Sequence, residues 1–461
     1  MENKKICIIG AGIGGLTTGV LLTKKGYKVT IYEKESIFGG RALSFQGSSI
    51  KLNEYQKLLN RFNMKVAFSE PEIDTIFSKK MLNGYQLDLG FHIIGGGITD
   101  TINEILSKEE SKIGFLDSFI GFIENNNYNY PFLSKIDKIK VAPNIIRLIF
   151  ANEKKLKEMD KQSIAETIKK YGNGKMKLIL EVFSRSITTI NDLEKISSGE
   201  MLRAQKNLYK GAKPVAYPEK GLINICKSFA AFIIQNGGKI KLNKTVEEII
   251  IKDKKAIGIK TDNKKEYYDI IISNALVQNL FNIVDEKHFS KEYVKELKNL
   301  DGTGSLCAYY SFKEIPRELI GKSFHFIERD IGVEGNDAVG MIDFMISRPE
   351  SKMAAKDSVL VQSYIICTSK EAKNPVVLKK LKQILDKNLN VLIPEYKKNL
   401  NWAIYPTIWH LDGVAKTIEK DKVELKTPID NLFLVGDCVK APGIGFNCAL
   451  NSAIILSNKY F

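Results

Sequence analysis

The chain has 461 residues, of which 44% are hydrophobic and 26% are charged, a composition that excludes a disordered chain and a single small domain. Its formal net charge is +16, but only eight of the 69 basic residues are arginine and the lysines are spread along the chain, so nucleic acid is not an expected partner. The lysine excess leaves two interpretations, which are lysine-rich codon usage and peripheral contact with an anionic membrane surface.

The N-terminal stretch KKICIIGAGIGGLTTGVLLTKKGYKVTIYEKES, residues 4–36, predicts a strand, a tight turn, a helix and a second strand. Residues 5–9 and 28–32 are the strands, apolar as in a parallel sheet that is buried on both faces, and residues 16–25 have helical periodicity. Lysines before an apolar run also resemble a secretory signal, but the glycines favour the strand–turn–helix interpretation. No apolar run reaches the roughly 18 residues of a membrane span, so we expect neither a signal peptide nor a transmembrane helix. Most of the six cysteines lie in apolar runs, as buried free thiols do, which fits a reducing cytoplasm, with membrane association left open.

The turn carries the pattern G-x-G-x-x-G from Gly10 to Gly15 and predicts a dinucleotide site. Its glycines permit a tight turn, close approach of a pyrophosphate and close packing of the helix. Glu33 ends the second strand, where a carboxylate binds the ribose hydroxyls and disfavours a 2′-phosphate. The pair Gly39-Gly40 with Arg41 can wrap the same pyrophosphate. The expected contacts are Gly10, Ala11, Gly12, Ile13, Gly14, Gly15, Glu33, Lys34, Gly39, Gly40, Arg41 and Ala42.

The middle of the chain alternates apolar and lysine-rich segments. Residues 113–123 and 142–150 are apolar and flanked by lysines, as in the mouth of a substrate tunnel, a segment on a membrane surface, or ordinary core packing. Ser163 and Glu166 have the spacing of a capping box at a helix start. The elements predicted between residues 222 and 273 are a helix at 222–235, strands at 239–242 and 267–273, and a hairpin formed by 245–251 and 256–261. Strand-like runs between about 290 and 425 predict a further sheet.

The C-terminal stretch NLFLVGDCVKAPGIGFNCALNSAI, residues 431–454, predicts a strand at 432–435 followed by Gly436-Asp437 and a helix. Ligands of open α/β sheets bind where parallel strands end, so we expect Asp437 to accept hydrogen bonds from a bound cofactor. The turn at 443–445 should let the helix that starts near Phe446 point its N-terminus at that cofactor, where the helix dipole stabilises negative charge.

Four stretches together resemble the flavin-dependent amine oxidase superfamily, in particular its phytoene desaturase, carotenoid isomerase and protoporphyrinogen oxidase-like branch. They are GAGIGGLTTGVLLTKKGYKVTIYEKESIFGGRA at 10–42, LDLGFHIIGGG at 87–97, YPEKGLINICKSFAAFIIQNGGKIKLNKTVEEI at 217–249, and the C-terminal stretch at 431–454. The resemblance implies FAD as cofactor and an α/β fold, with an FAD-binding Rossmann-like domain of the glutathione reductase type built from discontinuous segments, plus an α+β substrate-binding domain. The implied boundaries are 1–95, 211–290 and 426–461 for the FAD-binding domain, 96–210 for a helical substrate region and 291–425 for the substrate-binding domain.

The same resemblance implies further site residues. A backbone group at Val246 should meet the adenine, and LDLGFHIIGGG should form a wall of the flavin site, with His92 either a catalytic group or a hydrogen-bonded core histidine. The segment NWAIYPTIWHL at 401–411 resembles one whose aromatic residues face the flavin. Its candidates for the site are Tyr405, Trp409 and His410, of which Trp409 and His410 are candidate catalytic residues. The further cofactor contacts expected are Gly90, Phe91, His92, Val246, Gly436, Asp437, Gly445 and Phe446.

The chemistry-bearing residue types exclude other mechanisms. The six cysteines form no C-x-x-C pair, and the four histidines show no metal-ligand spacing, so we expect no metal centre and leave the chemistry to the flavin. We expect an FAD-dependent oxidoreductase that desaturates, saturates or isomerises a large apolar polyene or isoprenoid. The alternatives are a protoporphyrinogen oxidase-like or amine oxidase-like flavoenzyme and, in another class, a non-catalytic prenyl- or lipid-binding protein on the same fold. The oligomeric state stays open.

Overall fold

The computed structural model describes residues 4–90, 93–106, 112–137, 139, 143, 152–172, 174–208 and 214–461. Its first sheet is parallel and has the strand order β11-β2-β1-β15-β21. The strands are β1 (Lys5–Ile9), β2 (Lys28–Tyr32), β11 (Lys239–Lys241), β15 (Ile270–Ser273) and β21 (Leu432–Leu434). N-terminal, middle and C-terminal segments therefore form one sheet, which confirms the expected α/β fold with a parallel sheet built from discontinuous segments. The numerical domain boundaries stay a prediction.

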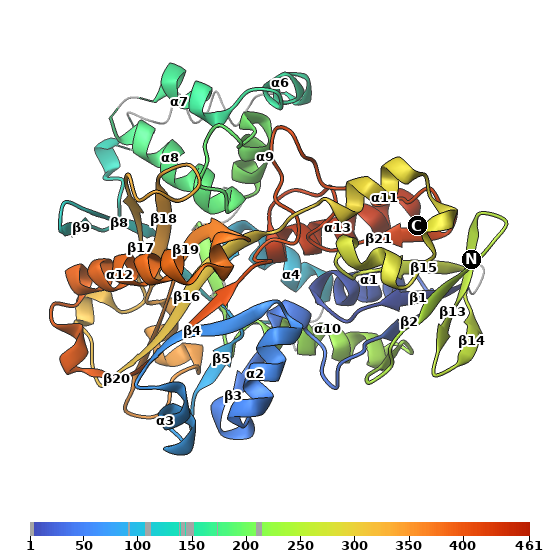
Figure 1. Cartoon of the computed structure of the whole chain (residues 1–461), viewed down its shortest axis with the longest axis horizontal. Helices are drawn as coiled ribbons and strands as arrows, with labels where there is room; N and C mark the ends of the chain where they lie inside the picture. Colours follow the sequence, from blue (N-terminus) through green and yellow to red (C-terminus); the bar gives the residue numbers. More distant parts are fainter. Residues whose placement is uncertain are drawn as a thin grey trace.

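Helices from both ends of the chain pack beside this sheet. Helix α1 (Ile13–Lys24) contacts α13 (Gly445–Tyr460) and α10 (Ile223–Gln235), and Figure 1 shows the blue α1 close to the red α13. Strand β1 is buried at every position after Lys5, as its continuous apolar run predicts for a covered parallel strand. The C-terminal helix is thus part of the same layer as the N-terminal one.

A small antiparallel sheet contacts the parallel sheet through its middle strand. Its strands are β12 (Glu248–Lys252), β13 (Lys255–Thr261) and β14 (Lys264–Tyr267), and β13 packs near β15. The antiparallel pairing of β12 with β13 confirms the predicted hairpin.

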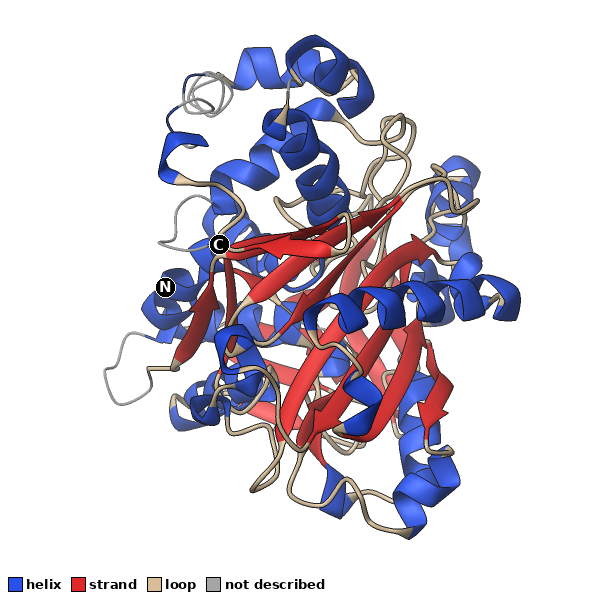
Figure 2. Cartoon of the chain, turned by 90° about the vertical axis from the view of Figure 1, so that its left-hand side faces the viewer, coloured by secondary structure: helices blue, strands red, loops and turns tan. Residues whose placement is uncertain are grey.

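The second large sheet has eight strands in the order β4-β20-β16-β19-β18-β17-β8-β9. They are β4 (Met64–Glu70), β8 (Ile120–Glu124), β9 (Asn127–Asn129), β16 (Thr303–Phe312), β17 (Ser323–Glu328), β18 (Ala338–Asp343), β19 (Val359–Thr368) and β20 (Leu400–Ile408). One face packs under helix α12 (Pro375–Leu392) in a core of its own, and Figure 2 shows this helix lying across the strands. Side chains of the opposite face join the core of the parallel sheet.

A group of helices lies beside the eight-stranded sheet, at the top of Figure 1. It consists of α6 (Glu153–Met159), α7 (Ile164–Tyr171), α8 (Lys175–Thr188) and α9 (Ser198–Leu208). The amide of Glu166 donates to Ser163 Oγ at 3.1 Å, which confirms the expected cap of α7. Within the described ranges, none of the helices combines the length and apolar character needed to cross a bilayer.

The other helices and strands include two small antiparallel sheets, with the strand orders β6-β10-β7 and β3-β5. They are α2 (Leu52–Arg61), α3 (Ile73–Ser78), α4 (Thr99–Leu106), α11 (Lys291–Lys298), β3 (Ser44–Gln46), β5 (Gln86–Asp88), β6 (Ile94–Gly95), β7 (Phe115–Ser118) and β10 (Val215–Pro218). The apolar stretch 113–123 therefore forms β7 and most of β8, and Phe122 is buried in the core. The other apolar stretch, 142–150, lies outside the described residues except for residue 143.

Candidate functional site

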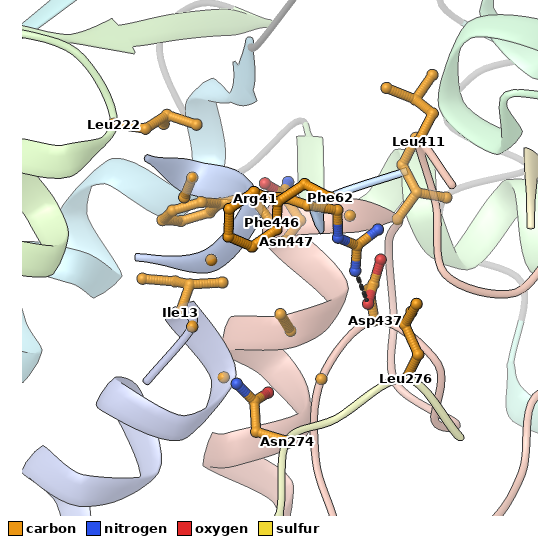
Figure 3. A pocket seen from close by; sticks show the side chains of 18 of the residues that line it. Ile13, Arg41, Phe62, Leu222, Asn274, Leu276, Leu411, Asp437, Phe446 and Asn447 are labelled. Atoms are coloured by element: carbon orange, nitrogen blue, oxygen red, sulfur yellow. Dashed lines mark hydrogen bonds and ion pairs between the residues drawn. The ribbon is translucent and has the colours of Figure 1, made fainter. Parts of the chain in front are cut away.

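A cavity of about 630 Å³ is lined by residues of both large sheets. Figure 3 shows part of its wall, with Ile13 of α1, Phe446 of α13 and the Arg41–Asp437 pair around one space. On the side of the parallel sheet the lining includes Gly10, Gly12, Ile13, Gly14, Glu33, Lys34, Gly39, Gly40, Arg41, Ala42, Val246, Asn274, Gly436, Asp437, Gly445 and Phe446. Most of the expected cofactor contacts therefore meet at one cavity, at the carboxyl ends of the parallel strands, where ligands of such sheets bind.

Two glycine-rich turns form one corner of this cavity. The amide of Gly39 donates to the Ala11 carbonyl at 2.8 Å, and Gly12 and Gly39 form a parallel bridge. A Cβ on Gly15 would lie 2.1 Å from the Gly10 carbonyl oxygen, so only glycine lets the helix start so close to β1. The first turn of α1 thus presents its unpaired amide groups at this corner, the arrangement that binds pyrophosphate.

Glu33 is held by backbone donors at the end of β2. Its Oε2 accepts from the Ala11 amide at 2.7 Å and its Oε1 accepts from the Glu35 amide at 3.0 Å. The side chain is buried on the cavity wall, in the position expected for a ribose ligand. Ala11 and Gly15 do not line the cavity; they contribute to the conformation of the glycine turn.

Asn274 lies between the first glycine turn and Gly436, although nothing in the glycine pattern indicated it. Its backbone amide donates to Ile9 at 2.8 Å, and its side-chain amide lies 3.4 Å from the Gly10 carbonyl. A Cβ on Gly12 or Gly14 would approach the Asn274 side chain to within 2.9 or 2.6 Å. Asn274 directly follows β15. Its position after a parallel strand is the feature of the sequence that could have predicted it as a site residue.

Arg41 and Asp437 form a partly buried ion pair on the cavity wall, drawn as a dashed line in Figure 3. Arg41 donates to Asp437 Oδ1 at 2.6 Å and to the His410 carbonyl at 2.6 Å, and Asp437 Oδ2 accepts from the Gly413 amide at 2.7 Å. Burial alone would raise the pKa of Asp437, but the charges of Arg41 and Lys422 and the hydrogen bonds from Arg41 and the Gly413 amide together hold that pKa below its usual range. Asp437 therefore stays ionised and positions Arg41.

A second buried pair fixes the start of α13. Lys422 Nζ lies 2.8 Å from Asp412 Oδ2, and both side chains are only 2% exposed. Asp412 Oδ1 accepts from the Gly445 amide at 2.9 Å, so this carboxylate caps the helix whose N-terminus reaches the cavity. Burial would lower the pKa of Lys422, but the Asp412 carboxylate raises it above its ordinary value. No local pattern in the sequence indicated this pair.

Asp88, in the stretch LDLGFHIIGGG, accepts hydrogen bonds from three residues of other segments. It accepts from the Ser44 hydroxyl, from the Tyr217 hydroxyl at 2.6 Å and from the Leu222 amide at 3.4 Å. Burial raises its pKa to about 6, although these three donors lower it. The neighbouring Gly90 is not among the lining residues, and its carbonyl accepts from Tyr309 at 2.9 Å. The other predicted contacts of this stretch, Phe91 and His92, lie outside the described residues.

Stability should depend on pH through Asp88. The folded state binds the proton of the Asp88 carboxyl group more tightly than the unfolded chain does, because an aspartate in an unfolded chain has a pKa near 4. The contribution therefore stabilises the fold below about pH 4 and is lost as the pH rises through about 6. Between those values, the unfolding free energy of the wild type should fall by about 3 kcal/mol relative to that of Asp88→Asn. Urea unfolding across this pH range measures the difference. The control Asp74→Asn removes an exposed carboxylate. A difference in unfolding free energy between the wild type and Asp88→Asn that does not change with pH would contradict this role.

Tyr405 on β20 and Trp409, which directly follows that strand, lie on the face of the sheet that points away from the cavity. Tyr405 is buried under α12 and donates to Asp386 Oδ1 at 2.9 Å, and Trp409 packs against that same core, with Lys373 Nζ 5.4 Å from its ring. Because side chains alternate along a strand, Ile404 and Ile408 face the other side, and Ile408 lines the cavity. The expectation that Tyr405 and Trp409 line the site is therefore wrong, because the residues directly before them in the chain face the cavity side of the sheet instead.

His410 lies next to the cavity but contributes its backbone. Its carbonyl accepts from Arg41, while its ring is not among the lining residues. Burial, followed by the charge of Arg41, lowers the pKa of the His410 ring to about 4, which keeps the imidazole neutral near pH 7. Its candidate role as a catalytic residue is unsupported by this placement.

The part of the cavity along the eight-stranded sheet was missed by the sequence patterns. Here the wall consists of Ile120 on β8, Phe183, Ser186 and Ile187 on α8, His325 on β17, Met341 on β18, Tyr364 on β19 and Ile408 on β20. These residues come from five strands and one helix far apart in sequence. The wall is mostly apolar and, among the described residues of this part, carries no Asp, Glu, Lys or Arg.

The family model of the flavin-containing amine oxidoreductases matches residues 13–458, and the chain belongs to this family. FAD is accordingly its cofactor. The residues present fit it, because the glycine turns, Glu33 and the start of α13 border one cavity. Bound FAD supplies hydride or single-electron chemistry; the chain holds and orients it.

Curated relatives are similar to the chain in sequence, and a solved structure is similar to it in fold. The chain is 24% identical over 330 residues, 68% of its length, to the 1-hydroxycarotenoid 3,4-desaturase of Flavobacterium sp. strain P99-3, and 26% identical over 324 residues, 62% of its length, to the chloroplastic prolycopene isomerase of Daucus carota. It spans 64% and 50% of those two relatives. An oxidoreductase from Methanosarcina mazei shares the fold, with a TM-score of 0.72 and 20% identity over 99% of this chain and 100% of that one.

Proposed function

We propose that the protein uses FAD to desaturate, saturate or isomerise carbon–carbon bonds of a large, apolar polyene or isoprenoid. The observation that carries the proposal is the continuation of the cofactor cavity along an apolar, uncharged wall formed by residues such as Phe183, Ile187 and Met341. A long hydrocarbon gains free energy on entering such a space. The relatives named above act on carotenoids according to their names, which supports this substrate class.

The alternatives fit the same wall less well. An amine substrate is cationic near neutral pH, and a buried cation needs a carboxylate or another charge-compensating partner; the described wall along the eight-stranded sheet offers none. A protoporphyrinogen-like substrate carries carboxylates and would need basic partners there. The Lys and Arg residues of the described lining are Lys34, Arg41, Arg61 and Lys244. Arg41 is paired with Asp437 and Arg61 with Glu35, and the two lysines are next to Glu33 and Val246.

The proposal is tested by expressing the protein in cells that accumulate phytoene or prolycopene and recording the absorption spectrum of the extracted lipids. We expect a shifted polyene spectrum, and a yellow purified protein with a flavin spectrum. Glu33→Ala, which lacks the ribose ligand, is the matched control and should leave the polyenes unchanged. Oxidation of protoporphyrinogen without any change in the polyenes would overturn the proposal, as would a colourless protein that rejects added FAD.

Contact with a membrane surface stays a prediction from the lysine excess.

A further inference from the structure

Helix α8 ends in a strained backbone conformation at the cavity wall. Phe183, Ser186 and Ile187 of this helix line the cavity, and so does Thr189, which directly follows it. Thr189 has a φ of 55° and a ψ of 33°, in the left-handed region. Among the described non-glycine residues with a positive φ, it is the one with a β-branched side chain, for which this conformation costs free energy. Such strain persists where surrounding contacts hold it, and it is concentrated at functional sites.

A chain of hydrogen bonds holds Thr189 in this conformation. Its Oγ1 lies 2.7 Å from the Thr188 carbonyl oxygen and 2.8 Å from Thr303 Oγ1. Because a carbonyl can only accept, the Thr189 hydroxyl donates to Thr188 and accepts from Thr303. Thr303 Oγ1 in turn accepts from the Asp412 amide at 3.0 Å. The donor of every hydrogen bond is therefore defined, and the chain runs from Asp412 to the end of α8.

The middle of this chain, Thr303, is buried and does not touch the cavity. Thr303 is the first residue of β16, it is 3% exposed, and it is not among the lining residues. Its backbone adds two further hydrogen bonds to the same segment, from its own amide to the Asp412 carbonyl at 3.2 Å and from the Leu411 amide to its carbonyl at 2.9 Å. Because Thr189 and Asp412 are also buried, removal of the Thr303 hydroxyl leaves its two partners unsatisfied.

The far end of the chain is the cap of helix α13. The Asp412 carboxylate accepts from the Gly445 amide at 2.9 Å, and Gly445 and Phe446 line the cavity on the side of the cofactor. The hydrogen bonds thus connect the end of α8, in the apolar wall, with the start of α13. Transfer between a substrate on one wall and a flavin on the other depends on their relative position.

We propose that Thr189 and Thr303 are positioning residues, whose hydroxyl groups hold the apolar wall at α8 in a fixed place relative to the start of α13. The inference rests on the proposed function for the assignment of α8 to the substrate, whereas FAD at α13 follows from the family. Because Thr303 lies outside the cavity, any effect of its hydroxyl on a ligand passes through Thr189 or Asp412.

The test is a double-mutant cycle on FAD binding, measured by titrating the apoproteins of wild type, Thr189→Val, Thr303→Val and the double variant. Valine keeps the β-branched shape and removes the hydroxyl. Each single exchange should weaken FAD binding between about twofold and tenfold, the range for one hydrogen bond. The double variant should bind FAD no more weakly than Thr303→Val alone, because the chain is already broken at Thr303.

The same variants are compared for an apolar ligand. The hydrocarbon farnesene is titrated in detergent into FAD-saturated protein, and its Kd is taken from the change in the flavin absorbance spectrum. Thr303→Val should raise this Kd by a similar factor, although Thr303 does not line the cavity.

Two controls separate positioning from general stability. Thr303→Ser keeps the hydroxyl and should bind FAD and farnesene as the wild type does. Thr407→Val removes another buried hydroxyl, which donates to the Ala372 carbonyl at 2.7 Å on β20. It should lower the midpoint of urea unfolding and leave both Kd values unchanged.

Wild-type FAD affinity in Thr303→Val, or additive effects of the two valine exchanges, would overturn the inference. So would an unchanged farnesene Kd in Thr303→Val, and the proposed function would then still stand. A wild type that binds FAD but not farnesene would overturn the proposed apolar substrate class and with it the part of the inference that concerns α8.

Discussion

Replacing Asp437 with alanine should release most of the FAD from the purified protein. Asp437 is the carboxylate that pairs with Arg41 on the cavity wall and accepts the Gly413 amide. The variant removes the carboxylate that positions Arg41 on the cavity wall and that we expect to accept a hydrogen bond from the cofactor, and a hydrogen bond to a charged group contributes about 1.5–3 kcal/mol. We therefore expect FAD to bind about a hundredfold more weakly, measured by titrating the apoprotein and by the ratio of flavin to protein after gel filtration.

The controls separate loss of the pair from loss of the fold. Asp437→Asn keeps an acceptor for Gly413 but removes the charge, and it should fall between the wild type and Asp437→Ala. Asp421→Ala removes a half-exposed carboxylate that pairs with Lys440 and should retain full occupancy. If Asp437→Ala keeps its FAD with unchanged affinity, the C-terminal turn is not part of the cofactor site as described.

Replacing Lys422 with methionine should cause a large loss of stability. The substitution leaves the Asp412 carboxylate buried with the Gly445 amide and without its counter-ion. Breaking a buried ion pair by removing one partner costs about 3–5 kcal/mol, so the midpoint of urea unfolding should fall accordingly. Because Asp412 caps α13, the same variant should also weaken FAD binding through a displaced helix N-terminus.

A double variant distinguishes an unpaired charge from lost packing. Adding Asp412→Asn to Lys422→Met removes the buried charge but keeps an oxygen for the Gly445 amide, so much of the stability should return. Lys398→Met breaks an exposed pair with Glu395 and should cost less than about 1 kcal/mol. A Lys422→Met protein as stable as the Lys398→Met control would show that the buried pair does not stabilise the helix start.

The order of elements and the cofactor corner were predictable because they depend on residues close in sequence. The glycine turn must follow β1 and precede α1, and Gly15 has no substitute where a Cβ would lie 2.1 Å from the Gly10 carbonyl. Such local constraints leave a signature in residue type and spacing alone. The same holds for the hairpin of β12 and β13 and for the Ser163 cap of α7.

The face of a strand was harder to predict than the strand itself. The run at 401–411 was expected to form part of the site, and β20 does reach the cavity through Ile408. The aromatic Tyr405 nevertheless points under α12, because a shift of one residue exchanges the two faces. Both faces of β20 are buried, so the apolar pattern carried no information on which face meets the substrate.

The cofactor class, the parallel sheet and the glycine corner could be predicted from the amino-acid sequence, since each needs particular residue types at short spacings. Which distant side chains share a wall depends on the tertiary structure. It aligned His325, Met341 and Tyr364 across three strands under α8, and it placed Lys422 against Asp412 beneath α13. The physical reason is that strand register and the burial of charge depend on how whole elements pack, and packing joins residues whose spacing in the chain is arbitrary.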